Sequence, residues 1–129
     1  MATLTTKLTL TSANATSSAL NVSVNDTLTV TEPLIGISRV DAPASSSSAL
    51  EIVSNTAVAK YIYIKNTGTQ SDGSTAATHE LKVKLGTVAS IRLAAGEFCS
   101  FPVEPSLAVN IHSEGSQLII TEYAYWTKG

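Results

Sequence analysis

Two histidines, His79 and His112, and one cysteine, Cys99, are the side chains of this sequence best suited to nucleophilic or acid–base catalysis. A nucleophilic serine or cysteine needs a base within hydrogen-bond reach, and neither histidine lies in a recognisable motif of that kind. His79 opens an alternating segment and His112 ends another, so we expect both to be ordinary surface or edge residues. Cys99 alternates with Phe98, which predicts a packed free thiol.

Four glutamates could supply the paired carboxylates of a glycoside hydrolase, namely Glu97, Glu104, Glu114 and Glu122. They stand at turns and strand ends, where solvated charges on the rim of a fold are the ordinary case. No cysteine–histidine cluster has the spacing of a metal site, and residues 72–74 lack the alternating carboxylates of a calcium loop. We therefore expect no enzyme activity, no catalytic or metal-binding residues and no cofactor.

Three aromatic residues, Tyr123, Tyr125 and Trp126, gather near the end of the chain. Such rings can stack on a sugar or bury themselves at a protein interface. Packing in a core or an interface is the favoured interpretation, and a glycan-binding platform is the alternative.

The composition excludes several classes of partner. The chain has 129 residues, with 8 basic and 10 acidic side chains and a net charge of −2, and no run of Lys or Arg provides the basic footprint of a nucleic-acid-binding protein. No apolar run is long enough for a membrane-spanning helix, and the first residues alternate in polarity, unlike a signal peptide. We therefore expect neither nucleic acid nor a membrane as a partner, and synthesis in a cytosol.

The elements that position these side chains are predicted to be β-strands. The sequence contains 17 serines and 17 threonines, and apolar residues recur at period two between clusters of Gly, Pro, Asn and Ser. This pattern predicts an all-β fold, an antiparallel β-sandwich or jelly roll. Residues 58–65 are the best candidate for a central strand, and residues 79–85 are expected to be its neighbour in the same sheet.

The Thr/Ser-rich segment 1–31 alternates too, but it has few large apolar groups. Asn25 and Asp26 are predicted to form the turn of a hairpin over residues 19–31. We expect either an N-terminal arm or hairpin at 1–31 followed by a β-sandwich domain at 32–129, or one continuous domain at 1–129. An unpaired strand of this kind tends to pair with a strand of another chain. We therefore expect a homo-oligomer, with a trimer favoured.

Four motifs mark the rest of the chain: Lys-Tyr-Ile-Tyr-Ile-Lys-Asn-Thr-Gly at 60–68, Ile-Arg-Leu-Ala-Ala-Gly-Glu-Phe at 91–98, Phe-Pro at 101–102, and the closing segment 118–126. In this combination residues 58–126 resemble small all-β virion structural proteins of tailed bacteriophages. The Thr-rich opening is similar to N-terminal segments of the same kind of protein. The resemblance implies a virion component, usually a capsid decoration protein, and it carries over no catalytic residues.

The expected function is therefore that of a non-enzymatic capsid decoration (cement) protein, made in the host cytoplasm and located in the virion. Its expected partners are the major capsid protein or other virion proteins. The alternatives are a tail or fibre component and a carbohydrate-binding jelly roll that recognises the host surface. The residues expected at an interface are apolar and aromatic: Leu4, Leu8, Leu10, Leu20, Val22, Val24, Tyr123, Tyr125 and Trp126.

Overall fold

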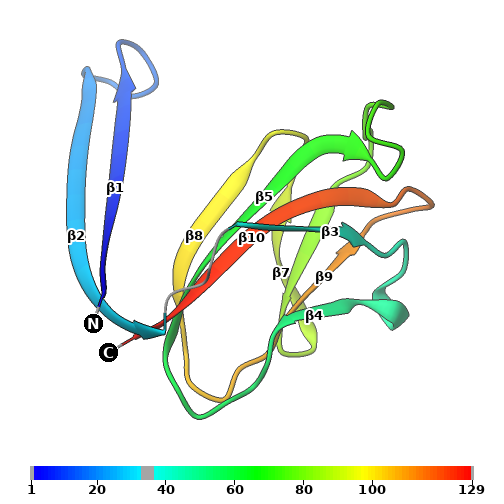
Figure 1. Cartoon of the computed structure of the whole chain (residues 1–129). Coiled ribbons are helices and arrows are strands. Elements are labelled where there is room, and N and C mark those ends of the chain that lie inside the picture. Colours follow the sequence, from blue (N-terminus) through cyan, green and yellow to red (C-terminus); the bar gives the residue numbers. More distant parts are fainter. Residues whose placement is uncertain (1, 33–36, 129) are drawn as a thin grey trace.

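Ten β-strands and one short 3₁₀ turn form the regular structure of residues 2–32 and 37–128, which the computed structural model describes (Figure 1). Strands prevail because alternating apolar and β-branched residues favour an extended backbone. The 3₁₀ turn η1 (Ser46–Ser48) lies in a serine-rich loop. The strands are β1 (Ala2–Ser12), β2 (Leu20–Glu32), β3 (Ser38–Ala42), β4 (Leu50–Val53), β5 (Lys60–Gln70), β6 (Leu81–Leu85), β7 (Val88–Leu93), β8 (Phe98–Val103), β9 (Val109–Ser113) and β10 (Ile119–Lys128).

The strands form two antiparallel sheets. The larger sheet has the order β1-β2-β10-β5-β8 with β3 also paired to β10, and the smaller has the order β4-β9-β6-β7. The last eight strands pair from the outside inward, β3 with β10, β4 with β9, β5 with β8, and β6 with β7. This nested ribbon, folded over into two sheets, is the jelly-roll arrangement. The all-β sandwich predicted from alternation is confirmed.

The core lies between the two sheets and is built from the inward-facing member of each alternating pair. Ile62 and Ile64 of β5 face Leu81 of β6 and Ile111 of β9, and all four are 0% exposed. Burial of apolar surface contributes about 25 cal/mol per Å², so these positions dominate the stability of the sandwich. They also hold β5 rigidly, and β5 carries one wall of the candidate site below.

The prediction that residues 58–65 and 79–85 are neighbours is wrong. β5 lies between β10 and β8 in the larger sheet, whereas β6 lies between β9 and β7 in the smaller one. The chain crosses from one sheet to the other after β5. In the nested ribbon the partner of β5 is β8, which comes later in the chain than β6. The central position predicted for residues 58–65 is confirmed, since β5 has a strand on each side.

The hairpin turn predicted at Asn25 and Asp26 is also wrong. β2 runs through both residues, which lie opposite Lys7 and Thr6 of β1. The chain turns instead at residues 13–19, where the Ser12 hydroxyl accepts the backbone N–H of Ala15 at 3.0 Å. A hydroxyl that bonds its own backbone stabilises a turn, whereas the extended pairing with β1 keeps Asn25 and Asp26 in a strand.

The β1–β2 hairpin, residues 2–32, is called the arm below. It joins the sandwich through a short contact between β2 and the end of β10, at Glu32 opposite Thr127 and Val30 opposite Lys128. Beyond this contact the arm stands apart from β8, as Figure 1 shows. The larger sheet is therefore continuous at its base and divided farther out.

Candidate interaction surface

The arm has one apolar face and one polar face. In the β1–β2 register Leu4 lies opposite Leu28, Leu8 opposite Val24, and Leu10 opposite Val22, and partners in a ladder share a face. The other face carries mostly Thr, Ser and Asn side chains. All six arm residues expected at an interface lie on the apolar face: Leu4, Leu8, Leu10, Leu20, Val22 and Val24.

Burial along the apolar face changes from the base of the arm to its tip. At the base Leu28 and Val30 are buried, with 8% and 1% of their surface exposed. Toward the turn Leu8, Leu10 and Val24 are 47%, 45% and 54% exposed. These last three residues are called the arm tip below. A two-stranded hairpin is marginal in water without packing on one face, and in the described structure no other element covers the arm tip.

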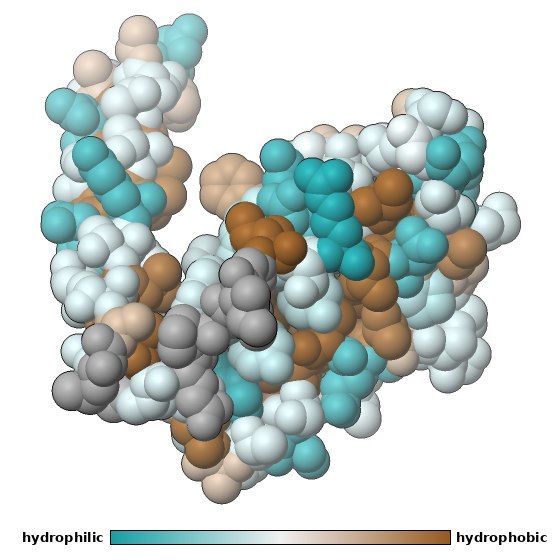
Figure 2. Space-filling model, viewed as in Figure 1, coloured by the Kyte–Doolittle hydropathy of each residue, from teal (hydrophilic) through white to brown (hydrophobic). Residues whose placement is uncertain are grey.

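A groove of about 700 Å³ separates the arm from the sandwich. Leu8 and Val24 line it on the arm side, and Tyr61, Phe98 and Pro102 line it on the side of β5 and β8. Phe98 is 65% exposed, which is unusual for so large an apolar side chain. Figure 2 shows hydrophobic residues on the side of the arm that faces the sandwich, across a hollow. Apolar side chains therefore stand on both walls of the groove, beside polar ones that include Thr6, Asp26 and Ser100.

The sandwich wall of this groove is not apparent from the sequence. Tyr61 lies opposite Pro102 in the pairing of β5 with β8, and Phe98 lies opposite Lys65, so these residues occupy the outer face of the larger sheet. Alternation does predict that Tyr61 faces away from the core, because Tyr61 alternates with the inward-facing Ile62. Alternation alone does not show which outward face borders the arm.

The three aromatic residues near the C-terminus do not form one row. Tyr123 and Tyr125 pair with Ile64 and Ile62 and pack against the core. Trp126 lies on the opposite face of β10, beside Tyr61. The structure therefore does not place these three aromatics with the arm residues on a single surface.

Trp126 and Tyr61 belong to a small cluster on the outer face of the larger sheet. The Lys128 ammonium lies 5.9 Å from the centroid of the Tyr61 ring, within range of a cation–π interaction. This cluster stands close to the junction of the arm with the sandwich, since Lys128 pairs with Val30. Its contacts favour a structural role at that junction.

The histidines do not assemble a catalytic pair. The expectation that both lie at the surface or an edge is wrong for His112, which is 7% exposed because β9 is an inner strand. Its Nδ1 contacts the carbonyl of Ser113 at 3.1 Å, and its Nε2 has no partner in the described part of the chain. The His79 ring packs instead under Gly115. Among the described residues neither ring forms a hydrogen bond with a serine hydroxyl or with the thiol, as a catalytic base would.

Cys99 has the character expected of a packed thiol. It lies opposite Ile64 on the inner side of β8 and packs against the core. Burial raises the pKa of the Cys99 thiol to about 11. Because the thiolate is the nucleophilic form, this thiol is poorly suited to catalysis near neutral pH.

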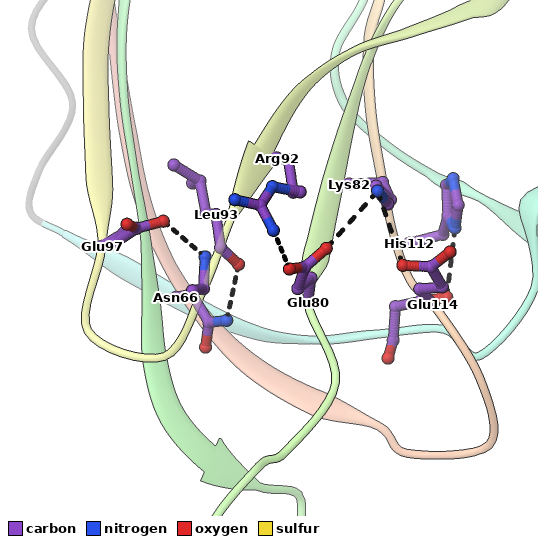
Figure 3. Close-up of polar contacts among 10 residues, drawn as sticks. Asn66, Glu80, Lys82, Arg92, Leu93, Glu97, His112 and Glu114 are labelled. Carbon is purple, nitrogen blue, oxygen red and sulfur yellow. Dashed lines mark hydrogen bonds and ion pairs between the residues drawn. The ribbon is translucent and has the colours of Figure 1, made fainter.

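A cluster of charges lies at one end of β6, β7 and β9 in the smaller sheet (Figure 3). Lys82 Nζ lies 3.6 Å from Glu80 Oε2 and 3.5 Å from Glu114 Oε2, and Arg92 also pairs with Glu80. Ion pairs at a surface contribute at most about 1 kcal/mol each. Since each carboxylate engages a cation, the cluster is an ion-pair network that links β6 to its neighbours.

Glu122 belongs to a second, separate network. Tyr63 Oη donates a hydrogen bond to Glu122 Oε1 at 2.9 Å, and Arg39 Nη2 donates to Oε2 at 3.1 Å. The hydrogen bond from Tyr63 and the Arg39 guanidinium hold the pKa of Glu122 below its usual range, against desolvation. Burial and the contact with Glu122 raise the pKa of Tyr63. Glu122 is thus stabilised as a carboxylate by its neighbours.

Residues 2–32 and 37–128 contain no group of three or more His, Cys, Asp or Glu side chains that could hold a metal ion. Within the same ranges no helix is long and apolar enough to cross a membrane. A scan against protein-family models finds no matching family, and a search of the curated proteins finds no match. The geometry of the arm and its groove is therefore the main basis for a functional proposal.

Proposed function

We propose that this protein is a non-enzymatic structural component of a tailed-phage virion, a decoration (cement) protein that binds the major capsid protein on the outside of the shell as a homo-oligomer. The observation that carries the proposal is the arm tip. Its three large apolar residues are about half exposed, and monomeric soluble proteins rarely present such groups together without a binding role.

The chemistry of the groove supports attachment rather than turnover. Both walls carry large apolar side chains, and the ionisable side chains among the lining residues are Lys7, Asp26, Tyr61 and Cys99, of which Asp26 is the one carboxylate. Cys99 is protonated near neutral pH, and Lys7 alternates with the apolar face of β1. An apolar groove with few ionisable groups suits the hydrophobic centre of a protein interface.

The aromatic residues also favour assembly over the alternative of glycan recognition. A sugar-binding platform needs exposed rings on one surface, and Tyr123 and Tyr125 pack inward against the core. Their rings fill space between the sheets. The jelly roll itself decides nothing, because the same architecture occurs in capsid proteins and in lectins.

The test is electron cryomicroscopy of virions produced with the chain, without it, and with an arm-tip variant. In the variant Leu8→Ser, Leu10→Ser and Val24→Thr remove apolar surface from positions that are already half exposed. We expect extra density on the outer capsid only when the natural chain is present. The arm-tip variant is expected to keep its circular dichroism spectrum and to lose attachment.

The matched control changes the opposite face of the same hairpin, with Thr9→Ala, Thr11→Ala and Ser23→Ala. This control is expected to attach normally, because the polar face is not the proposed contact. Density in the tail or fibres would favour the alternative location and overturn the capsid assignment. Binding of the isolated chain to a glycan array, undisturbed by the arm-tip variant, would favour host-surface recognition instead.

A further inference from the structure

Strand β1 is an unprotected sheet edge, and it differs in this from the other edges of the described structure. β8 contains Pro102, β3 carries Arg39 and Asp41, β7 has only six residues and carries Arg92, and β4 has only four residues. Short strands, prolines and charges are the usual means by which an edge avoids pairing. β1 has 11 residues, no proline and one charged side chain, Lys7.

The backbone of β1 is paired on one side only. β1 is hydrogen-bonded to β2 along its full length, from Ala2 to Ser12. In the described residues no further strand lies beyond β1 in the sheet. Alternate N–H and C=O groups of β1 therefore face outward. Such a row of groups is a template for another strand.

The sequence of β1 selects the partner strand. Residues 3–9 read Thr-Leu-Thr-Thr-Lys-Leu-Thr, a pattern that is nearly the same in both directions about Thr6. Two copies paired antiparallel with Thr6 opposite Thr6 would place Leu4 opposite Leu8 of the second copy. Such pairs share a face of the sheet, so the apolar faces of the two arms would become continuous.

Other registers are less favourable. A shift of one residue in the pairing places the apolar face of one copy beside the polar face of the other. Centring the pair on Lys7 places two ammonium groups opposite one another, and like charges directly opposite are destabilising. With Thr6 at the centre, Lys7 lies opposite Thr5 of the second copy.

We propose that two copies of this chain associate through antiparallel pairing of their β1 edges, centred on Thr6. The two hairpins then form one four-stranded antiparallel sheet, in the order β2-β1 of one copy and β1-β2 of the other. A two-fold contact of this kind satisfies the same edge on both copies at once. The contact is made through the backbone edge of the arm. Leu8 of the arm tip then lies beside Leu4 of the second copy, and the joined apolar face remains open for the capsid contact.

The contact is two-fold, whereas the trimer favoured from the sequence needs a cyclic contact between different surfaces. The proposal also does not depend on a virion. The isolated chain tests it in solution, and its failure would leave the capsid assignment untouched, since that assignment is tested on particles.

Cysteine cross-linking tests the register directly, in a Cys99→Ala background of the full chain. Antiparallel partners have Cα atoms about 4.5–5.5 Å apart, within the range that a disulfide spans. Thr6→Cys is therefore expected to give a covalent dimer on mild oxidation. Thr9→Cys is the matched control. Residue 9 lies three residues from the two-fold axis on each copy, so the two thiols would be about 20 Å apart.

A charge swap at Thr5 gives a second measurement that does not depend on oxidation. Thr5 is exposed on the polar face, and in the proposed register it lies opposite Lys7 of the second copy. Thr5→Glu is expected to strengthen the dimer and Thr5→Lys to weaken it, with dissociation constants about tenfold apart. The same pair of substitutions at Thr29, on β2, is expected to have little effect.

The expected result is a dimer in sedimentation experiments, a cross-link at position 6 and none at position 9, and opposite effects of the two charges at position 5. A chain that stays monomeric up to millimolar concentration would overturn the proposal. A trimer, or equal cross-linking at positions 6 and 9, would also overturn it.

Discussion

The side-chain amide of Asn66 donates a hydrogen bond to the backbone carbonyl of Leu93 at 3.0 Å (Figure 3). Asn66 is 0% exposed, and its Oδ1 accepts the backbone N–H of Gly68 at 2.9 Å. Its own backbone N–H donates to Glu97 and its carbonyl accepts from Gly96. One residue of β5 thus holds the turn between β7 and β8 in place. Its hydrogen bonds connect the sequence motif at 60–68 with the motif at 91–98.

Asn66→Ala is expected to lower the free energy of unfolding by about 1–3 kcal/mol. The substitution leaves the Leu93 carbonyl and the Gly68 N–H without their side-chain partner in a buried site. Urea denaturation measures the loss. Asn110→Ala is the matched control, because its amide makes only a long contact of 3.4 Å with Gly86 in a less buried position. An equal loss in both variants would contradict the role assigned to Asn66.

Gly115→Ala is expected to destabilise the protein more than Gly73→Ala. Both glycines have a positive φ, +102° and +79°, so a side chain is strained at either position. A Cβ at Gly115 would lie 2.7 Å from the His79 ring, whereas a Cβ at Gly73 meets nothing within 4 Å. Thermal unfolding compares the two variants.

The cause of the larger loss at Gly115 is testable with a second substitution. Combining Gly115→Ala with His79→Ala removes the ring that the new Cβ would meet. We expect the double variant to show a smaller penalty for Gly115→Ala than the natural background, a coupling that a double-mutant cycle measures. Strictly additive losses would show that backbone strain alone accounts for the effect.

Cys99 is expected to react slowly with thiol-alkylating reagents in the folded protein. With a pKa raised to about 11 by burial, about one thiol in a thousand is ionised at pH 8. The rate should rise steeply with pH and approach that of a free cysteine peptide when the protein is unfolded in urea. Mass spectrometry follows the modification. Rapid labelling of the native protein at pH 7 would contradict the packing of this thiol.

Acid is expected to weaken the fold partly through Glu122. Because the Tyr63 hydrogen bond lowers the folded-state pKa, the contribution of Glu122 is fully present above the ordinary pKa of glutamate. It is lost as the pH falls through the lower folded-state pKa. Glu122 retains some solvent exposure, so the contribution is expected to be less than about 1 kcal/mol.

Tyr63→Phe removes the hydrogen bond and isolates this effect from the other carboxylates. Its stability relative to the natural protein is expected to be lowest near pH 7 and to approach the natural value as the pH falls through the lowered pKa of Glu122. Chemical denaturation at several pH values measures the difference. A difference independent of pH would assign the loss to packing of the Tyr63 ring rather than to the carboxylate.

Much of the local structure follows from the pattern of single residues. The alternation in β5 predicts which side chains face the core, and Ile62 and Ile64 are indeed fully buried. The alternation in the arm likewise predicts that Leu8 and Leu10 share a face. The turn predicted at Asn25 and Asp26 is wrong, because Asn and Asp favour turns and yet also occur in a strand when a neighbouring strand pairs with them.

Alternation along the chain is enough to predict the class of fold and the faces of the strands, since side chains on a strand point alternately to its two sides. The pairing of β5 with β8 and β10, and not with β6, arises from the folding of the whole ribbon, because a jelly roll pairs strands that are far apart in the chain. The same folding divides Tyr125 from Trp126, one facing the core and the other the outside. It also places Phe98 across from Leu8, far away in sequence, and so creates the apolar groove on which the proposed function depends.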